Sequence, residues 1–195
     1  MFAYGLNPKQ ISGGPGWMET ELYDIQARPE AQGTPSRKQL EGMIQNLVAE
    51  RFKLSFHREK KELNVYAITV GKNGPKMMKN TSDPNGLPGL MFRGAGILPA
   101  RNANMQDLAS VLQAVVLDRP VIDQTGLEGR FDFELKWTPD ETQFGGRAGN
   151  AGKDDPAAPP DLYTAFQEQL GLQLKAVKAP IDVLVIDRVE KPSAN

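Results

Sequence analysis

The single histidine of this sequence, His57, stands close to a serine and a carboxylate, the residue types of a hydrolytic triad. Apolar Phe56 and its neighbours alternate with polar residues here, as in a half-buried strand, so His57 should face away from the core beside Ser55 and Glu59. These types could supply a general base or a Ser–His–carboxylate set. Side chains two positions apart on a strand point in parallel, which places Ser55 poorly for bonding the ring in line. We therefore favour a surface histidine and leave the catalytic alternative open.

An acidic group, Asp123, Glu128 and Asp132, surrounds one turn of the second half of the chain. Paired carboxylates could perform acid–base chemistry or bind a hard cation. Asp132, however, has a counterpart in Asp24, and a recurring residue is expected to serve the fold. Asp123 follows a strand and favours an Asx turn. If the chain is a hydrolase, the candidate residues are Ser55, His57, Asp123 and Asp132, and they must converge in one pocket.

Two further segments carry candidate binding residues. Four acidic residues lie within or beside a Gly- and Pro-rich insertion at 139–160: Asp140, Glu141, Asp154 and Asp155. Oxygen ligands suit calcium, but the spacing is not that of an EF-hand, so a solvated loop is favoured. A second segment runs from Ser12 to Trp17 and includes Gly13, Gly14 and Gly16. It lacks the Gly-Lys-Ser/Thr of a phosphate loop. A tryptophan on a glycine loop could bind a ligand or partner, or could pack on the sheet.

Composition limits the classes of function. The chain has 195 residues, a formal net charge of −1 and no cysteine. Nucleic acid is therefore not an indicated partner, and disulfides, thiolate metal sites and a cysteine nucleophile are excluded. No apolar run approaches the ~18 residues of a membrane helix. The first residues lack the basic and apolar regions of a signal peptide. No cofactor is indicated, although a divalent cation such as calcium is left open.

The elements that must position these residues occur twice. Residues 43–74 align with 161–192 without a gap, so that the apolar residues of both segments coincide. Upstream, Leu22 to Ala27 is predicted as a strand, because Tyr23-Asp24-Ile25 matches Phe131-Asp132-Phe133. Each repeat predicts a helix followed by two strands, at 54–56 and 65–70 in the first and at 172–174 and 183–186 in the second. Such self-similarity indicates a duplicated supersecondary unit.

The predicted fold is α+β, with two related strand–helix–strand–strand repeats, antiparallel or mixed sheets, and helices on one face. The first repeat unit spans 1–79, a connection spans 80–90, and the second unit spans 91–195 with its flexible insertion. The first unit lacks the counterparts of a strand and most of a helix. We therefore expect an N-terminally truncated first repeat, short by roughly 25 residues.

Several stretches resemble a soil-associated, acidobacterial-type family of unknown function (DUF3738). They cover nearly the whole chain and include Gln10-Ile11-Ser12-Gly13-Gly14-Pro15-Gly16-Trp17, Ala49-Glu50-Arg51-Phe52-Lys53-Leu54, Arg119-Pro120-Val121-Ile122-Asp123, Gly129-Arg130-Phe131-Asp132-Phe133 and Val183-Leu184-Val185-Ile186-Asp187. The resemblance implies a periplasmic or extracytoplasmic setting and no established activity. The helix and strand pattern is also similar to that of the short N-terminal domains of secretins and TonB-dependent receptors, which are binding and assembly modules.

Together these observations favour a non-catalytic binding or assembly module that recognises a protein partner or a small molecule. One alternative is a small hydrolase of esters, lactones or amides, with or without a metal. A second alternative is an accessory sensory domain of a membrane peptidase. The sequence leaves the oligomeric state open.

Overall fold

The computed structural model describes residues 2–28, 37–81, 87–148 and 156–192, and these form two compact units. Unit 1 comprises residues 1–62 and 180–195, and unit 2 comprises residues 63–179. The predicted α+β class is confirmed, since the chain contains helices and two four-stranded sheets. The compact units are defined by contacts within the structure, whereas the repeats are defined by sequence similarity. The repeat boundaries at 79 and 91 therefore stay a prediction.

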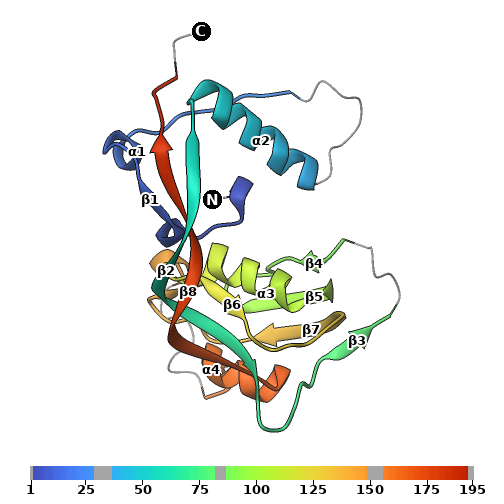
Figure 1. Ribbon diagram of the computed structural model, residues 1–195. Coiled ribbons are helices and arrows are strands. Elements are labelled where there is room, and N and C mark those ends of the chain that lie inside the picture. Colours follow the sequence, from blue (N-terminus) through green and yellow to red (C-terminus); the bar gives the residue numbers. More distant parts are fainter. Residues whose placement is uncertain (1, 29–36, 82–86, 149–155, 193–195) are drawn as a thin grey trace. The chain divides into compact units, whose positions relative to one another are not determined.

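Two long strands, β2 (Ser55–Val70) and β8 (Leu172–Arg188), lie side by side (Figure 1). The sequence predicted two strands in place of each, and this expectation was wrong. The residues between the two strands predicted within β2 are charged, and they are exposed strand residues. Oppositely charged side chains of β2 and β8 form an ion pair, in which Lys60 Nζ lies 3.7 Å from Asp182 Oδ1. Opposite charges across a strand pair favour the extended ladder over a turn.

Unit 2 contains strands of both sheets. The second half of β2 pairs in parallel with β6 (Val121–Asp123). The other sheet has the order β3 (Met78–Asn80), β7 (Arg130–Lys136), β5 (Ile97–Ala103) and β4 (Gly89–Leu90), and its pairs are antiparallel. Met91-Phe92 in the sequence predict the opening of a strand, but β4 ends at Leu90.

The helices of unit 2 begin at side-chain caps. Helix α3 (Met105–Val111) follows Asn104, which forms a capping box with Asp107, and continues as a π-helical turn, η3 (Leu112–Val116). Helix α4 (Leu162–Ala165) is capped by Asp161 and continues as η5 (Phe166–Leu170). Such caps satisfy amide groups that have no partner within the helix. The sequence predicts Asn104 as the cap of the helix that starts at Met105, and the capping box confirms this prediction.

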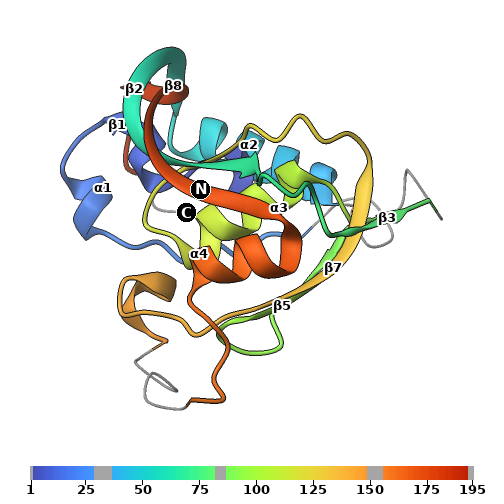
Figure 2. The same cartoon turned by 90° about the horizontal axis from the view of Figure 1, so that it is seen from below.

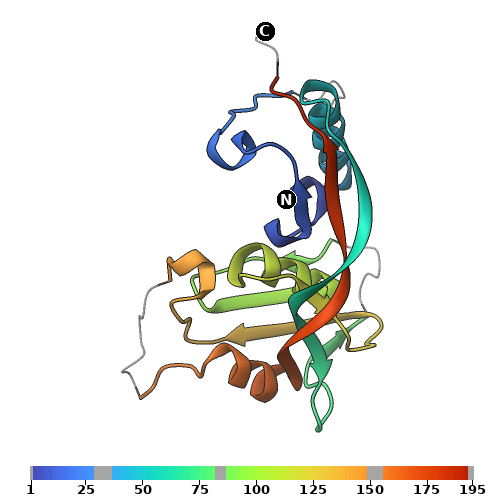
Figure 3. The same ribbon diagram turned by 60° about the vertical axis from the view of Figure 1, so that its left-hand side comes forward.

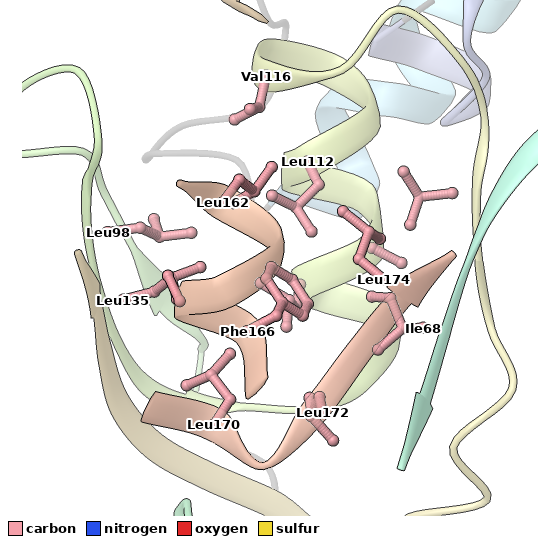
Figure 4. Close-up of a cluster of buried hydrophobic side chains, with 14 of the residues drawn as sticks. Ile68, Leu98, Leu112, Val116, Leu135, Leu162, Phe166, Leu170, Leu172 and Leu174 are labelled. Carbon is pink, nitrogen blue, oxygen red and sulfur yellow. The ribbon is translucent and has the colours of Figure 1, made fainter. Parts of the chain in front are cut away.

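The core of unit 2 surrounds these two helices. Figure 2 shows α3 and α4 inside the curve of β5 and β7, and Figure 4 shows Leu98 and Leu135 on one side of Phe166, with Ile68 and Leu174 on the other. All of these side chains are buried. Burying a large apolar side chain contributes about 1.5–3 kcal/mol, so this cluster dominates the stability of the unit. The helices are thus covered by strands on two sides.

Unit 1 contains shorter elements and a smaller core. Its elements are η1 (Phe2–Tyr4), η2 (Pro8–Gln10), β1 (Ile11–Gly13), α1 (Trp17–Thr20) and α2 (Arg37–Arg51), with one half each of β2 and β8. Helix α2 lies along the β2–β8 strands (Figure 3). Its apolar side chains are only half-buried or exposed, in contrast to those of α4. The sequence predicts that Ser36 begins this helix, with Gln39 completing a capping box, but Ser36 lies outside the described residues.

The two repeats agree in backbone detail. Strand β1 pairs in parallel with β8, and Ile11 lies opposite Leu184. Strand β6 pairs in parallel with β2, and Val121 lies opposite Tyr66. The offset that aligns residues 43–74 with 161–192 also aligns Tyr66 with Leu184. It further aligns Lys53 with Gly171, and both have the left-handed backbone that ends a helix, with φ of 51° and 67°.

Candidate functional site

Residues 21–28 form an exposed stretch of unit 1 outside any helix or strand, which we call the open segment. Glu21 has extended dihedral angles, with φ of −104° and ψ of 134°. Leu22 is 100% exposed and Ile25 is 51% exposed. Contrary to our prediction, residues 22–27 do not form a strand, since their backbone makes no hydrogen bond with any described residue. The open segment therefore presents backbone donors, acceptors and apolar side chains together.

An aromatic cluster fixes the start of the open segment. The Tyr23 ring lies edge-on to Phe52 at 5.3 Å and to Trp17 at 6.1 Å between centroids. The Lys191 Nζ atom lies 5.9 Å from the Trp17 ring centre and forms an ion pair with Glu21. The Tyr23 hydroxyl also donates to Glu21, so hydrogen bonds from Lys191 and Tyr23 lower the pKa of that carboxyl. These contacts hold one end of the segment in place.

The glycine loop lies next to this cluster in the chain. Gly13 has φ of +80°, and a Cβ there would come within 3.0 Å of the Ile186 carbonyl oxygen. Gly14 has φ of +91°, and a Cβ there would meet Met18. Gly13 and Gly14 thus allow close approach to β8, whereas Gly16 only precedes helix α1. Trp17 is half-buried, and its binding role stays a prediction.

His57 lies on the exposed face of β2 within unit 1. Its Nδ1 atom is 2.7 Å from Asp187 Oδ1, and its Nε2 atom is 3.1 Å from Glu59 Oε1. Hydrogen bonds to Glu59 and Asp187 raise the pKa of His57 above its usual value. Both ring nitrogens therefore contact carboxylates, which leaves neither aimed at a serine. Ser55 is exposed two residues earlier on the same strand.

Unit 2 has a cavity of about 500 Å³ beside the turn between β6 and β7. Its lining includes two of the predicted carboxylates, those of Asp123 and Glu128, with Asn80, Asn104, Gln106 and Arg130. Asp123 Oδ1 accepts from Thr125 N at 2.9 Å, which confirms the predicted Asx turn. Glu128 makes no hydrogen bond or ion pair with any other described residue.

The predicted hydrolase set is divided between the units. Ser55 and His57 belong to unit 1, whereas Asp123 and Asp132 belong to unit 2, so neither unit assembles the set by itself. The Asp132 carboxylate accepts from the Asn102 backbone N at 2.8 Å and from Asn80 Nδ2 at 2.7 Å. These two bonds lower the pKa of Asp132. Asp132 therefore connects strands within unit 2.

Of the four candidate calcium ligands, Asp140 bonds to other residues, Glu141 is exposed, and the other two lie outside the described residues. Asp140 accepts from the Thr142 backbone N at 2.8 Å and from Gln143 Nε2 at 2.7 Å. Glu141 is exposed, and Asp154 and Asp155 lie outside the described residues. Among the residues with assigned positions, no three acidic or imidazole groups come together as a metal-binding set. None of the described helices is long and apolar enough to cross a bilayer.

Sequence reasoning missed three contributors to the site: Phe52, Lys191 and the exposure of Leu22. Alternation of apolar residues predicted a strand at 22–27. It did not reveal that no described strand pairs with these residues. Phe52 and Lys191 lie far from Trp17 in sequence and reach it only through the fold.

The fold and site define the chain as an α+β protein of two units, with an exposed segment in unit 1 and a cavity lined by carboxylates in unit 2. Residues 1–189 match a family described as a protein of unknown function (DUF3738). The chain therefore belongs to that family. It matches no curated protein and no solved structure.

Proposed function

We propose that this chain is a non-catalytic binding or assembly module of an extracytoplasmic-type family, and that unit 1 binds a protein partner. One observation carries the proposal: the open segment exposes apolar Leu22 and Ile25 on backbone that makes no hydrogen bond with any described residue. Exposed apolar groups beside unpaired backbone are the features that protein partners recognise. The aromatic cluster at Tyr23 supports the proposal, because it orders one end of the segment and so reduces the entropic cost of binding.

The proposal is tested by peptide selection against the immobilised chain. A displayed library of random twelve-residue peptides is selected, and the enriched peptides are measured by titration calorimetry. We expect Leu22→Asp combined with Ile25→Asp to weaken binding at least tenfold. Met91→Asp is the matched control, since Met91 is an exposed apolar residue of unit 2. Failure of any peptide to enrich, or equal binding by the double variant, contradicts the proposal.

A second candidate function, hydrolysis of small esters, lactones or amides, is favoured by the cavity of unit 2. Asp123 and Glu128 line it together, and two carboxylates can divide the roles of acid and base. A panel of such substrates, with and without a chelator, tests this candidate. Turnover that is lost in both Asp123→Asn and Glu128→Gln supports hydrolysis, and turnover equal to a heat-killed control rejects it.

A further inference from the structure

The start of the open segment binds the ammonium group of Lys191. The Lys191 Nζ atom forms an ion pair with Glu21 Oε1 and lies over the Trp17 ring, 5.9 Å from its centre. The Tyr23 ring lies edge-on to Trp17 at 6.1 Å between centroids. A carboxylate beside the face of an indole ring attracts a cation through its charge and through the ring quadrupole. We call Trp17, Glu21 and Tyr23 the ammonium site.

The hydrogen bonds of Glu21 favour a primary ammonium group over a guanidinium. Glu21 Oε2 accepts from the Tyr23 hydroxyl at 2.9 Å, which leaves Oε1 to the cation, and Lys191 Nζ donates to Oε1. An arginine binds a carboxylate best through two parallel hydrogen bonds, which need both oxygens. A lysine ammonium is a compact charge that one oxygen can hold, whereas a quaternary ammonium has no N–H to donate. The site therefore fits a lysine side chain.

Lys191 fills the ammonium site without closing it. The side chains of Lys191 and Glu21 are 52% and 40% exposed, and Tyr23 is 37% exposed. Ion pairs at such exposure are weak, because water screens the charges and two flexible side chains must be ordered. A second ammonium group can therefore compete with Lys191 for the same atoms.

The ammonium site lies next to a fully exposed apolar residue of the open segment. Leu22 stands between Glu21 and Tyr23 in the chain and is 100% exposed. Residues 19–28 contain three acidic residues and one arginine, so this stretch keeps an excess of negative charge when Lys191 leaves. A partner that covers Leu22 therefore meets a carboxylate and an aromatic ring that suit a positive group.

We propose that the protein partner of unit 1 inserts a lysine side chain into the ammonium site and displaces Lys191. This inference deepens the proposed function and rests on it. The partner segment carries the lysine beside an apolar residue that contacts Leu22. Lys191 is then an internal competitor, and it lowers the apparent affinity for the partner because only chains with a vacant site can bind the lysine.

The test measures the binding of peptides enriched from the twelve-residue library to the full chain by titration calorimetry. We expect the enriched peptides to contain a lysine. Changing that lysine to methionine in the peptide should weaken binding about tenfold, and changing it to arginine should weaken binding about threefold. These peptide changes test the inference on the unaltered protein.

Two variants of the protein test the competition directly. Lys191→Met empties the ammonium site and should strengthen the binding of lysine peptides about three- to tenfold. Glu21→Gln removes the charge that holds the ammonium group and should weaken their binding about tenfold. Opposite effects from the two partners of one ion pair distinguish competition from a merely structural role of that pair.

Lys60→Met is the matched control, because Lys60 is an exposed lysine of unit 1 that pairs with Asp182 outside the ammonium site. It should leave the affinity unchanged, and circular dichroism shows whether each variant keeps the fold. Equal or weaker binding by Lys191→Met, or enriched peptides without lysine, overturns the inference while the proposed function stands. If no peptide enriches, both the inference and the proposed function fail.

Discussion

Tyr66 and Leu184 occupy equivalent positions in two parallel strand pairs, the first opposite Val121 and the second opposite Ile11. Tyr66 belongs to the first repeat but pairs with a strand of the second, whereas Leu184 belongs to the second repeat and pairs with a strand of the first. Each long strand therefore pairs with a short strand of the other predicted repeat, within one four-stranded sheet of order β1-β8-β2-β6.

Equivalent helix positions should differ in their contribution to stability. Leu162 in α4 is fully buried, whereas its counterpart Ile44 in α2 is half-buried. We expect Leu162→Ala to lower the free energy of unfolding by about 2–5 kcal/mol, and Ile44→Ala by less than about 1.5 kcal/mol. Urea titration followed by circular dichroism measures both. Equal losses would show that α2 is covered as completely as α4.

Gly171 should be intolerant of any side chain. Its φ is +67°, and a Cβ there would lie 2.0 Å from the Gly74 carbonyl oxygen. We expect Gly171→Ala to cost roughly 3 kcal/mol or more, from left-handed strain and the clash together. Gly126, with φ of +65° and open space, is the matched control and should cost only about 1–2 kcal/mol as alanine. Thermal or urea unfolding of the two alanine variants measures the loss in free energy of unfolding. Equal losses at Gly171 and Gly126 would contradict the close approach of Gly171 to the Gly74 carbonyl oxygen.

His57 should titrate above its usual value of 6.5, because Glu59 and Asp187 bond its charged form. As the only histidine of the chain, it gives one set of imidazole signals in a proton NMR titration. We expect Asp187→Asn to lower the pKa of His57 toward 6.5. The sign follows from linkage: any stabilisation by these bonds is complete below pH 6.5 and is lost as pH rises through the folded pKa. A wild-type pKa at or below 6.5 would contradict the geometry.

Much of the fold follows from local sequence, whereas the site depends on contacts that sequence does not display. Caps at Asn104 and Asp161 and the left-handed Gly171 are local features, and they were predictable from residue type and position. The continuity of β2 and β8 could not be predicted in the same way. Charged residues 57–62 have the composition of a turn, and they form a strand only because a facing strand carries opposite charges. The open segment was predicted as a strand because its pattern equals that of β7. Whether a strand forms depends on a neighbour, which one segment's sequence does not reveal.

The most direct measurement is amide hydrogen exchange of the free protein, comparing residues 22–27 with residues 130–135 of β7. From Tyr23 and Phe131 onward the two segments carry the same apolar pattern, but only β7 has hydrogen-bonded neighbours among the described strands. We predict exchange at 22–27 close to the unstructured rate and exchange in β7 slower by orders of magnitude. Protection of residues 22–27 comparable to that of β7 would show that the segment already has a partner strand, and would contradict the account.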